Sequence, residues 1–87
     1  MTDQRRQRRT RTSKRAFAYV GGHGFACDVI DASYNGCRIA CFRDVELPEV
    51  IELHVVGETR TTKAWVRWRN GREVGLSFSP VSEAVPI

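Results

Sequence analysis

The run of residues from Arg5 to Arg15 carries seven cationic side chains and no acidic one. The planar guanidinium of arginine binds phosphate oxygens through two parallel hydrogen bonds, and a cluster of such groups attracts polyanions. The run therefore indicates a phosphate ligand, which could belong to a nucleic acid, a lipid or a nucleotide. The alternative is a solvated tail that has no ligand.

A second polar stretch, Asp31 to Gly36, reads DASYNG. The carboxylate of Asp31 can accept hydrogen bonds from a ligand, and the Ser33 hydroxyl can donate one. Gly36 would let the backbone turn sharply and approach a ligand closely. The alternative is an Asx-turn between two strands, which accounts for the stretch if no second motif accompanies it.

Signals for catalysis are weak in this sequence. Ser33 stands in a turn without the G-x-S-x-G pattern, and GGHG at 21–24 has neither a Walker lysine nor a following helix. Glu46 and Glu49 flank Pro48 in a loop, where solvated acids explain them. The sequence therefore predicts a binding protein rather than an enzyme.

The three cysteines, Cys27, Cys37 and Cys41, have the spacing of neither a disulfide framework nor a zinc site, and His23 and His54 are not suitably placed around them. We therefore expect reduced thiols that act as small apolar core residues, with no metal and no cofactor. No apolar run approaches the ~18 residues that suggest a membrane span. No apolar stretch follows the basic N-terminus as in a signal peptide, so a cytoplasmic protein is expected.

The elements that must position these groups show a period of two. Six short strands are predicted, at 13–20, 25–31, 37–42, 50–56, 62–68 and 73–79, with turns between them and little room for helices. The residues predicted to face inward are Phe25, Cys27, Val29 and Asp31, then Cys37, Ile39 and Cys41, then Ile51, Leu53 and Val55, then Ala64, Val66 and Trp68, and finally Val74, Leu76 and Phe78. This pattern favours a small closed barrel or a tight sandwich. We divide the chain into a basic arm (1–12), a barrel (13–80) and a short tail (81–87).

The two tryptophans carry separate hypotheses. Trp68 is predicted to end the fifth strand on the core-facing side, where it either plugs the barrel or meets a ligand at its mouth. Trp65 shares a strand face with Lys63 and Arg67, a combination that could stack and hold nucleic-acid bases. An RNA- or DNA-binding barrel that uses the basic arm is therefore the alternative function. Against it, residues 16–87 carry nine acidic side chains and only seven Lys/Arg.

Two motifs combine across the chain. Arg5 and Arg9 form R-x-x-x-R, and twenty-two positions after Arg9 the residues Asp31, Ser33 and Gly36 form D-x-S-x-x-G. Both motifs, in this order and at this separation on an all-β pattern, resemble the PilZ domain family of bacterial cyclic di-GMP receptors. The strand order, the VRW strand and the closing VGLSF are similar to that family as well.

The R-x-x-x-R spacing occurs a second time, at Arg11 and Arg15. We assign the motif to Arg5 and Arg9 because their distance from Asp31 is similar to the family's usual separation. Gln4, just before the motif, lies at a position where family members differ and does not settle whether one ligand or a stacked pair binds.

The resemblance implies a fold, a ligand and a set of contacts. The fold would be a six-stranded antiparallel PilZ-type barrel with a flexible basic N-terminal arm. The ligand would be cyclic di-GMP, bound by Arg5, Arg9, Asp31, Ser33 and Gly36. Further contacts are expected from Arg6 and Arg8, with Arg11 as an auxiliary contact to phosphate, and Trp68 would lie against the ligand as an aromatic does in some family members.

A binding domain of this size must signal through a partner. We therefore expect a stand-alone adaptor that acts on an unidentified effector protein when ligand orders its arm. Nucleic acid is the less favoured partner. A third hypothesis is a PilZ-like interaction module that no longer binds nucleotide, and the intact motifs count against it.

Overall fold

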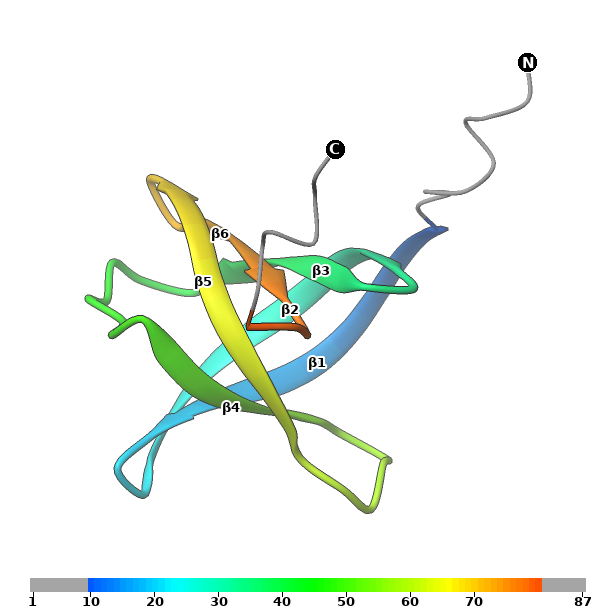
Figure 1. Ribbon diagram of the computed structural model, residues 1–87, viewed down its shortest axis with the longest axis horizontal. Coiled ribbons are helices and arrows are strands. Elements are labelled where there is room, and N and C mark those ends of the chain that lie inside the picture. Colours follow the sequence, from blue (N-terminus) through cyan, green and yellow to red (C-terminus); the bar gives the residue numbers. More distant parts are fainter. Residues whose placement is uncertain (1–9, 81–87) are drawn as a thin grey trace.

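The fold is all-β, as predicted. The computed structural model describes residues 10–80, which form a closed barrel of six antiparallel strands (Figure 1). The strands are β1 Thr10–Val20, β2 His23–Ser33, β3 Gly36–Cys41, β4 Val50–Val55, β5 Thr62–Asn70 and β6 Glu73–Ser77. Because β1 begins at Thr10, residues 10–12, which the sequence analysis counted with the basic arm, lie in a strand.

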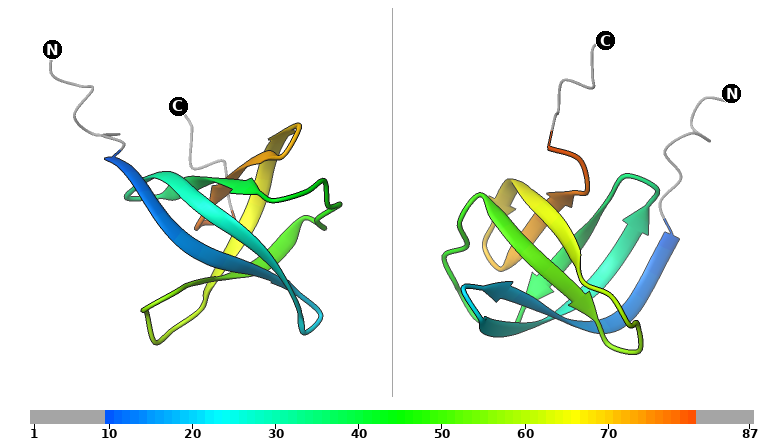
Figure 2. Two further views of the ribbon diagram at one scale, coloured as in Figure 1. Left: turned by 180° about the vertical axis from the view of Figure 1, so that it is seen from behind. Right: turned by 60° about the horizontal axis from the view of Figure 1, so that its bottom comes forward.

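The strand order around the barrel is β1-β2-β3-β6-β5-β4, and β4 pairs with β1 to close it. Within residues 10–80 each strand therefore pairs with a neighbour on both sides over at least part of its length, which leaves little strand edge to pair with another chain. Figure 2 shows the long strands β1 and β2 curving around the shared interior. The β1–β2 hairpin turns through Gly21 and Gly22, whose φ angles of 59° and 85° suit glycine best.

The core consists of small and medium-sized apolar side chains from all six strands. Ile39 and Ile51 are among the largest fully buried side chains, and Ala16 and Ala18 of β1 are completely buried. Most of the residues predicted to face inward are buried, namely Cys27, Val29, Cys37, Ile39, Cys41, Ile51, Leu53, Ala64, Val74 and Leu76. Alternation of apolar and polar residues thus identified the core face of five strands.

Three core residues were not predicted: Ala16 and Ala18, because no facing was assigned to the first strand, and Leu47, because it lies outside the strands. Leu47, in the loop between β3 and β4, is only 7% exposed. Two arginines of the β5–β6 hairpin hold this loop by its backbone: Arg69 Nη2 donates to the Val45 carbonyl at 3.2 Å, and Arg72 Nη1 donates to the Phe42 carbonyl at 2.7 Å. The loop is therefore fixed to the barrel with Leu47 in the core.

Two bulges overturn the predicted facing of Asp31 and Trp68. The β2–β3 register shifts between Val29 and Asp31, and the β5–β6 register shifts between Val66 and Trp68. A bulge inserts one residue without a partner, so every later side chain moves to the opposite face. Asp31 and Trp68 were predicted to share the inner face with Val29 and Val66. That prediction is wrong, because both lie on the outer face of the barrel.

Removal of side-chain volume at Ile39 should strongly destabilise the fold. Ile39 is fully buried and pairs with Val29 of β2 and Val74 of β6. We expect Ile39→Ala to lower the free energy of unfolding by about 2–4 kcal/mol, because the closed barrel cannot collapse around the cavity. Urea denaturation followed by circular dichroism measures the change. Val56→Ala, at a position 53% exposed, is the control and should stay within about 0.5 kcal/mol of the unaltered protein. Equal destabilisation by both variants would contradict the assigned core.

Candidate ligand-binding site on the outer face of the barrel

Five residues form one row across the outer face. Direct cross-strand partners link Arg11 of β1 to Asp31 of β2, then to Arg38 of β3, Gly75 of β6 and Trp68 of β5. Direct partners in antiparallel strands project from the same face. Arg38 lies between Cys37 and Ile39, whose side chains fill the core, so the row faces outward. The row thus brings three charged side chains and one aromatic ring together on one face.

An ion pair holds the centre of this row. Nη2 and Nε of Arg38 donate to Oδ2 of Asp31 at 2.6 and 3.0 Å, and Nη1 donates to Oε1 of Glu73 at 3.4 Å. The Asp31 side chain is 8% exposed and that of Arg38 is 37% exposed. A carboxylate this buried requires a charged partner, because removing it from water is costly. The pair therefore fixes the position of the guanidinium as well as that of the acid.

Ser33 and Gly36 lie at the end of the β2–β3 hairpin. They are direct partners on either side of the two-residue turn Tyr34–Asn35. The Ser33 hydroxyl lies 3.3 Å from Oδ1 of Asn35 and 3.4 Å from the Gly36 carbonyl oxygen, and its single hydrogen can be donated to one of them at a time. Both contacts are long, so a ligand acceptor can replace either of them.

Gly36 is required for close packing of strands. Its φ is not positive, so the expected sharp turn at this residue is not what the fold needs from it. A Cβ atom at Gly36 would overlap the backbone carbonyl oxygen of Leu76 in β6. Glycine therefore lets β3 and β6 approach where the hairpin ends.

Trp68 covers a glycine on the neighbouring strand. The side chain is 45% exposed, so it does not plug the barrel. A Cβ atom at Gly75 would fall on the indole nitrogen, which shows that the ring occupies the space that a side chain at that residue would need. Trp68 thus presents an aromatic surface two strands away from Arg38.

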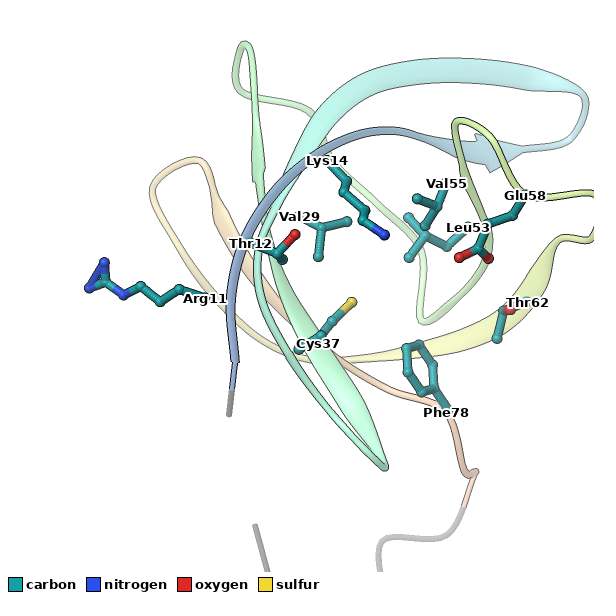
Figure 3. A pocket seen from close by; sticks show the side chains of 11 residues that line it. Arg11, Thr12, Lys14, Val29, Cys37, Leu53, Val55, Glu58, Thr62 and Phe78 are labelled. Carbon is teal, nitrogen blue, oxygen red and sulfur yellow. The ribbon is translucent and has the colours of Figure 1, made fainter. Parts of the chain in front are cut away.

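The structure describes only some of the arginines that are expected to bind ligand. Arg5, Arg6, Arg8 and Arg9 lie outside the described residues. Arg11 is the direct partner of Asp31, and Figure 3 shows its side chain pointing away from the barrel interior.

Arg15, in contrast, is engaged elsewhere. Its Nε donates to Oδ1 of Asp28 at 3.0 Å, and its guanidinium lies 4.6 Å from the ring centre of Phe42. Both Arg15 and Asp28 are well exposed, so this pair adds little stability. Arg15 thus contacts Asp28 of β2 and Phe42, which follows β3.

A cavity of about 470 Å³ opens at one mouth of the barrel, and the sequence analysis had not predicted it. Figure 3 shows Thr12 and Lys14 on its side of β1, opposite to Arg11. Its walls are mainly apolar and include Val29, Ala32, Cys37, Leu53, Val55 and Phe78, with Lys14 and Glu58 as charged groups. The apolar walls suit a dianionic nucleotide poorly, whereas the outer row offers cations, acceptors and a stacking surface.

Two of the buried cysteines have thiols of low reactivity. Burial raises the pKa of the Cys27 thiol to about 12, and burial also raises the pKa of Cys41. Both thiols are therefore protonated at neutral pH and are poor nucleophiles. Among residues 10–80, no group of three or more His, Cys, Asp or Glu side chains is arranged to hold a metal ion. The same part of the chain contains no helix long and apolar enough to cross a bilayer.

Arg38 is the residue that sequence reasoning missed. A signal was present: with a two-residue turn at Tyr34–Asn35, counting back along both strands pairs Asp31 with Arg38. Because Asp31 was assigned to the core face, an arginine on the neighbouring strand was not considered as its partner.

Comparison with known proteins agrees with the geometry. The family model of the PilZ domain matches residues 3–85, which is nearly the whole chain. A search of curated proteins gave no match.

The contact between Trp68 and Gly75 can be tested by fluorescence. In a Trp65→Phe background, which leaves Trp68 as the only indole, we expect Gly75→Ala to displace the ring, because the new methyl group needs its space. The emission should shift to longer wavelength and acrylamide quenching should increase, while the circular dichroism spectrum is unchanged. Ser77→Ala, on the same strand and face, is the control. Identical emission of Gly75→Ala and its parent would show that the indole does not cover this residue.

Proposed function

Because the chain belongs to the PilZ domain family, whose members in general bind cyclic di-GMP, we propose that it is a receptor for this dinucleotide. The observation that supports this most directly is the pairing of Thr10 with Ala32. It attaches the basic arm to the barrel between Asp31 and Ser33, as Figure 1 shows where β1 begins beside the β2–β3 turn. Arg9 is covalently bonded to Thr10. Even in a fully extended chain, the Cα atom of Arg5 lies within about 17 Å of the Cα atom of Thr10.

The ligand's chemistry matches these residues. Cyclic di-GMP has two phosphates and two guanines. Arg5 and Arg9 can bind phosphate oxygens and guanine O6 and N7, and they can also stack on a base. Asp31 accepts guanine N–H groups, and Ser33 donates to a phosphate or base acceptor.

The remaining contacts of the proposed site are supporting ones. Arg6 and Arg8 add phosphate contacts, Trp68 offers a stacking surface, and Gly36 keeps the hairpin end close to β6. PilZ domains are receptors rather than enzymes, and no catalytic step is part of this proposal.

We further propose that the chain is a cytoplasmic adaptor that reports the ligand to an effector protein. The five arginines between Arg5 and Arg11 repel one another, and a dianionic ligand would remove that repulsion. Ligand bound between the arm and the outer row would create a surface made of both. The signal is then the order of the arm rather than a change in the closed barrel.

The motif assignment is tested by two arginine variants. We expect Arg9→Ala to weaken cyclic di-GMP binding by about 2–4 kcal/mol, since charge-assisted hydrogen bonds contribute ~1.5–3 kcal/mol each. Arg15→Ala is the matched control and should have a much smaller effect, because Arg15 contacts Asp28 and Phe42. Titration calorimetry measures both affinities, with GTP and a short RNA as competing ligands. Loss of binding in Arg15→Ala alone would move the motif to Arg11 and Arg15, and saturable binding of RNA alone would favour the nucleic-acid function.

The adaptor mechanism is tested by NMR relaxation. We expect the backbone amides of residues 1–9 to move rapidly on the nanosecond timescale without ligand and to become as rigid as the strands at saturation with cyclic di-GMP. Ordering each residue costs about 1–2 kcal/mol of backbone entropy, so binding should show an unfavourable entropy. Amides of β3 are the internal reference. Arm amides that are rigid without ligand, or still mobile at saturation, would refute this mechanism.

A further inference from the structure

Arg38 is held on two sides, which is unusual for a side chain 37% exposed. Two of its nitrogens donate to Asp31 and a third donates to Glu73. A guanidinium has five N–H groups in one plane, and these three contacts use three of them. Long arginine side chains on a surface normally sample several rotamers, but this one has already lost that freedom to its neighbours.

The orientation of the guanidinium decides which edge is presented outward. Nε and Nη2 form one edge of the group, and both donate to Oδ2 of the buried Asp31. The other edge, formed by Nη1 and Nη2, is directed away from that carboxylate. On this edge Nη1 donates to Glu73 at 3.4 Å, a long contact with a half-exposed acid that another acceptor can replace.

This second edge can bind a base once a ligand acceptor replaces Glu73. Guanine presents two acceptors, O6 and N7, side by side, and an arginine fork binds them with two parallel hydrogen bonds. Adenine presents N7 beside the N6 amino group, which is itself a donor and therefore opposes a second arginine N–H. A fixed arginine fork consequently distinguishes the two purines.

A stacking surface lies within reach of the fork. Gly75 is the direct partner of both Arg38 and Trp68, so no side chain of β6 stands between them. At ~4.8 Å between strands, the Cα atoms of Arg38 and Trp68 are about 10 Å apart, and the indole leans over Gly75 into that interval. A purine stacked on the indole would therefore turn one edge toward Arg38.

We propose that Arg38, fixed by Asp31 and Glu73 beside Trp68, reads the O6/N7 edge of a guanine and makes the site prefer guanine over adenine dinucleotides. This inference rests on the proposed function and adds to it a specificity residue outside the R-x-x-x-R and D-x-S-x-x-G motifs. It also gives Asp31 a second role, as the residue that positions the reader.

The competing explanation is that Arg38 only neutralises the buried Asp31. Lysine can neutralise a carboxylate, but its single ammonium cannot form the planar fork. Arg38→Lys therefore separates the two roles. Arg60→Lys is the matched control, because Arg60 is an exposed arginine in the loop between β4 and β5.

The experiment is titration calorimetry of the full chain with cyclic di-GMP, cyclic di-AMP and the 7-deaza analogue of cyclic di-GMP, which lacks N7. We expect the unaltered protein and Arg60→Lys to prefer cyclic di-GMP over cyclic di-AMP by about 100-fold or more, and over the 7-deaza analogue by about 5- to 30-fold. In Arg38→Lys both preferences should shrink by about tenfold, with a melting temperature close to that of the unaltered protein.

Retention of both preferences in Arg38→Lys would overturn the inference and leave Arg38 as a counter-ion. If that variant does not fold, the side-chain N–H resonances of Arg38 in the unaltered protein provide the test: they should shift at saturation with cyclic di-GMP, and unchanged resonances would equally overturn it. Failure of the unaltered protein to bind cyclic di-GMP at all would instead refute the proposed function.

Discussion

The buried carboxylate of Asp31 is the constraint on which the binding face depends. At 8% exposure it cannot rely on water, so it requires the guanidinium of Arg38 opposite it. That requirement fixes an otherwise mobile surface arginine and places an arginine fork at the centre of the outer row. Without the bulge at Ile30, Asp31 would point into the apolar interior, where no arginine could reach it. The one inserted residue thus turns the Asp31 carboxylate away from the apolar core and toward Arg38 on the outer face.

The proposed site divides its work between two parts of the chain. The barrel supplies groups in fixed positions, namely the Asp31–Arg38 pair, the Ser33 hydroxyl and the indole of Trp68 over Gly75. The arm supplies charge, because residues 1–12 carry five arginines and one acid, whereas residues 16–87 carry nine acids and seven Lys/Arg. Fixed groups provide specificity, since their geometry is already determined before a ligand arrives. Concentrated charge provides attraction, since it acts at a distance and without exact geometry.

The sequence predicted the barrel well because its core is built by simple alternation. Ile39, Ile51 and Leu53 stand where a period of two places them, and hairpin turns separate the strands. Asp31 and Trp68 were assigned to the wrong face because a bulge leaves no clear mark in the pattern and reverses everything after it. Leu47 was missed because its burial depends on Arg69 and Arg72 holding a loop, which is a long-range contact. Ser33 was predicted to lie in the turn after the second strand, whereas it is the last residue of β2, two positions after Asp31.

The bulges also separate two environments that a small barrel could otherwise mix. In β1 regular alternation places Arg11 on the outer face and Lys14 at the mouth of the apolar cavity (Figure 3), and the register shift between these two residues keeps Arg11 opposite Asp31. The outer face thereby gathers the charged and polar groups of the site, while Val29, Leu53 and Phe78 line the interior. The apolar lining would make the interior a costly place for a charged ligand, whereas the proposed site on the outer row offers it cations. The change of face at Asp31, which the alternation of the strand did not reveal, therefore separates the apolar interior from the outer face on which the nucleotide site is proposed.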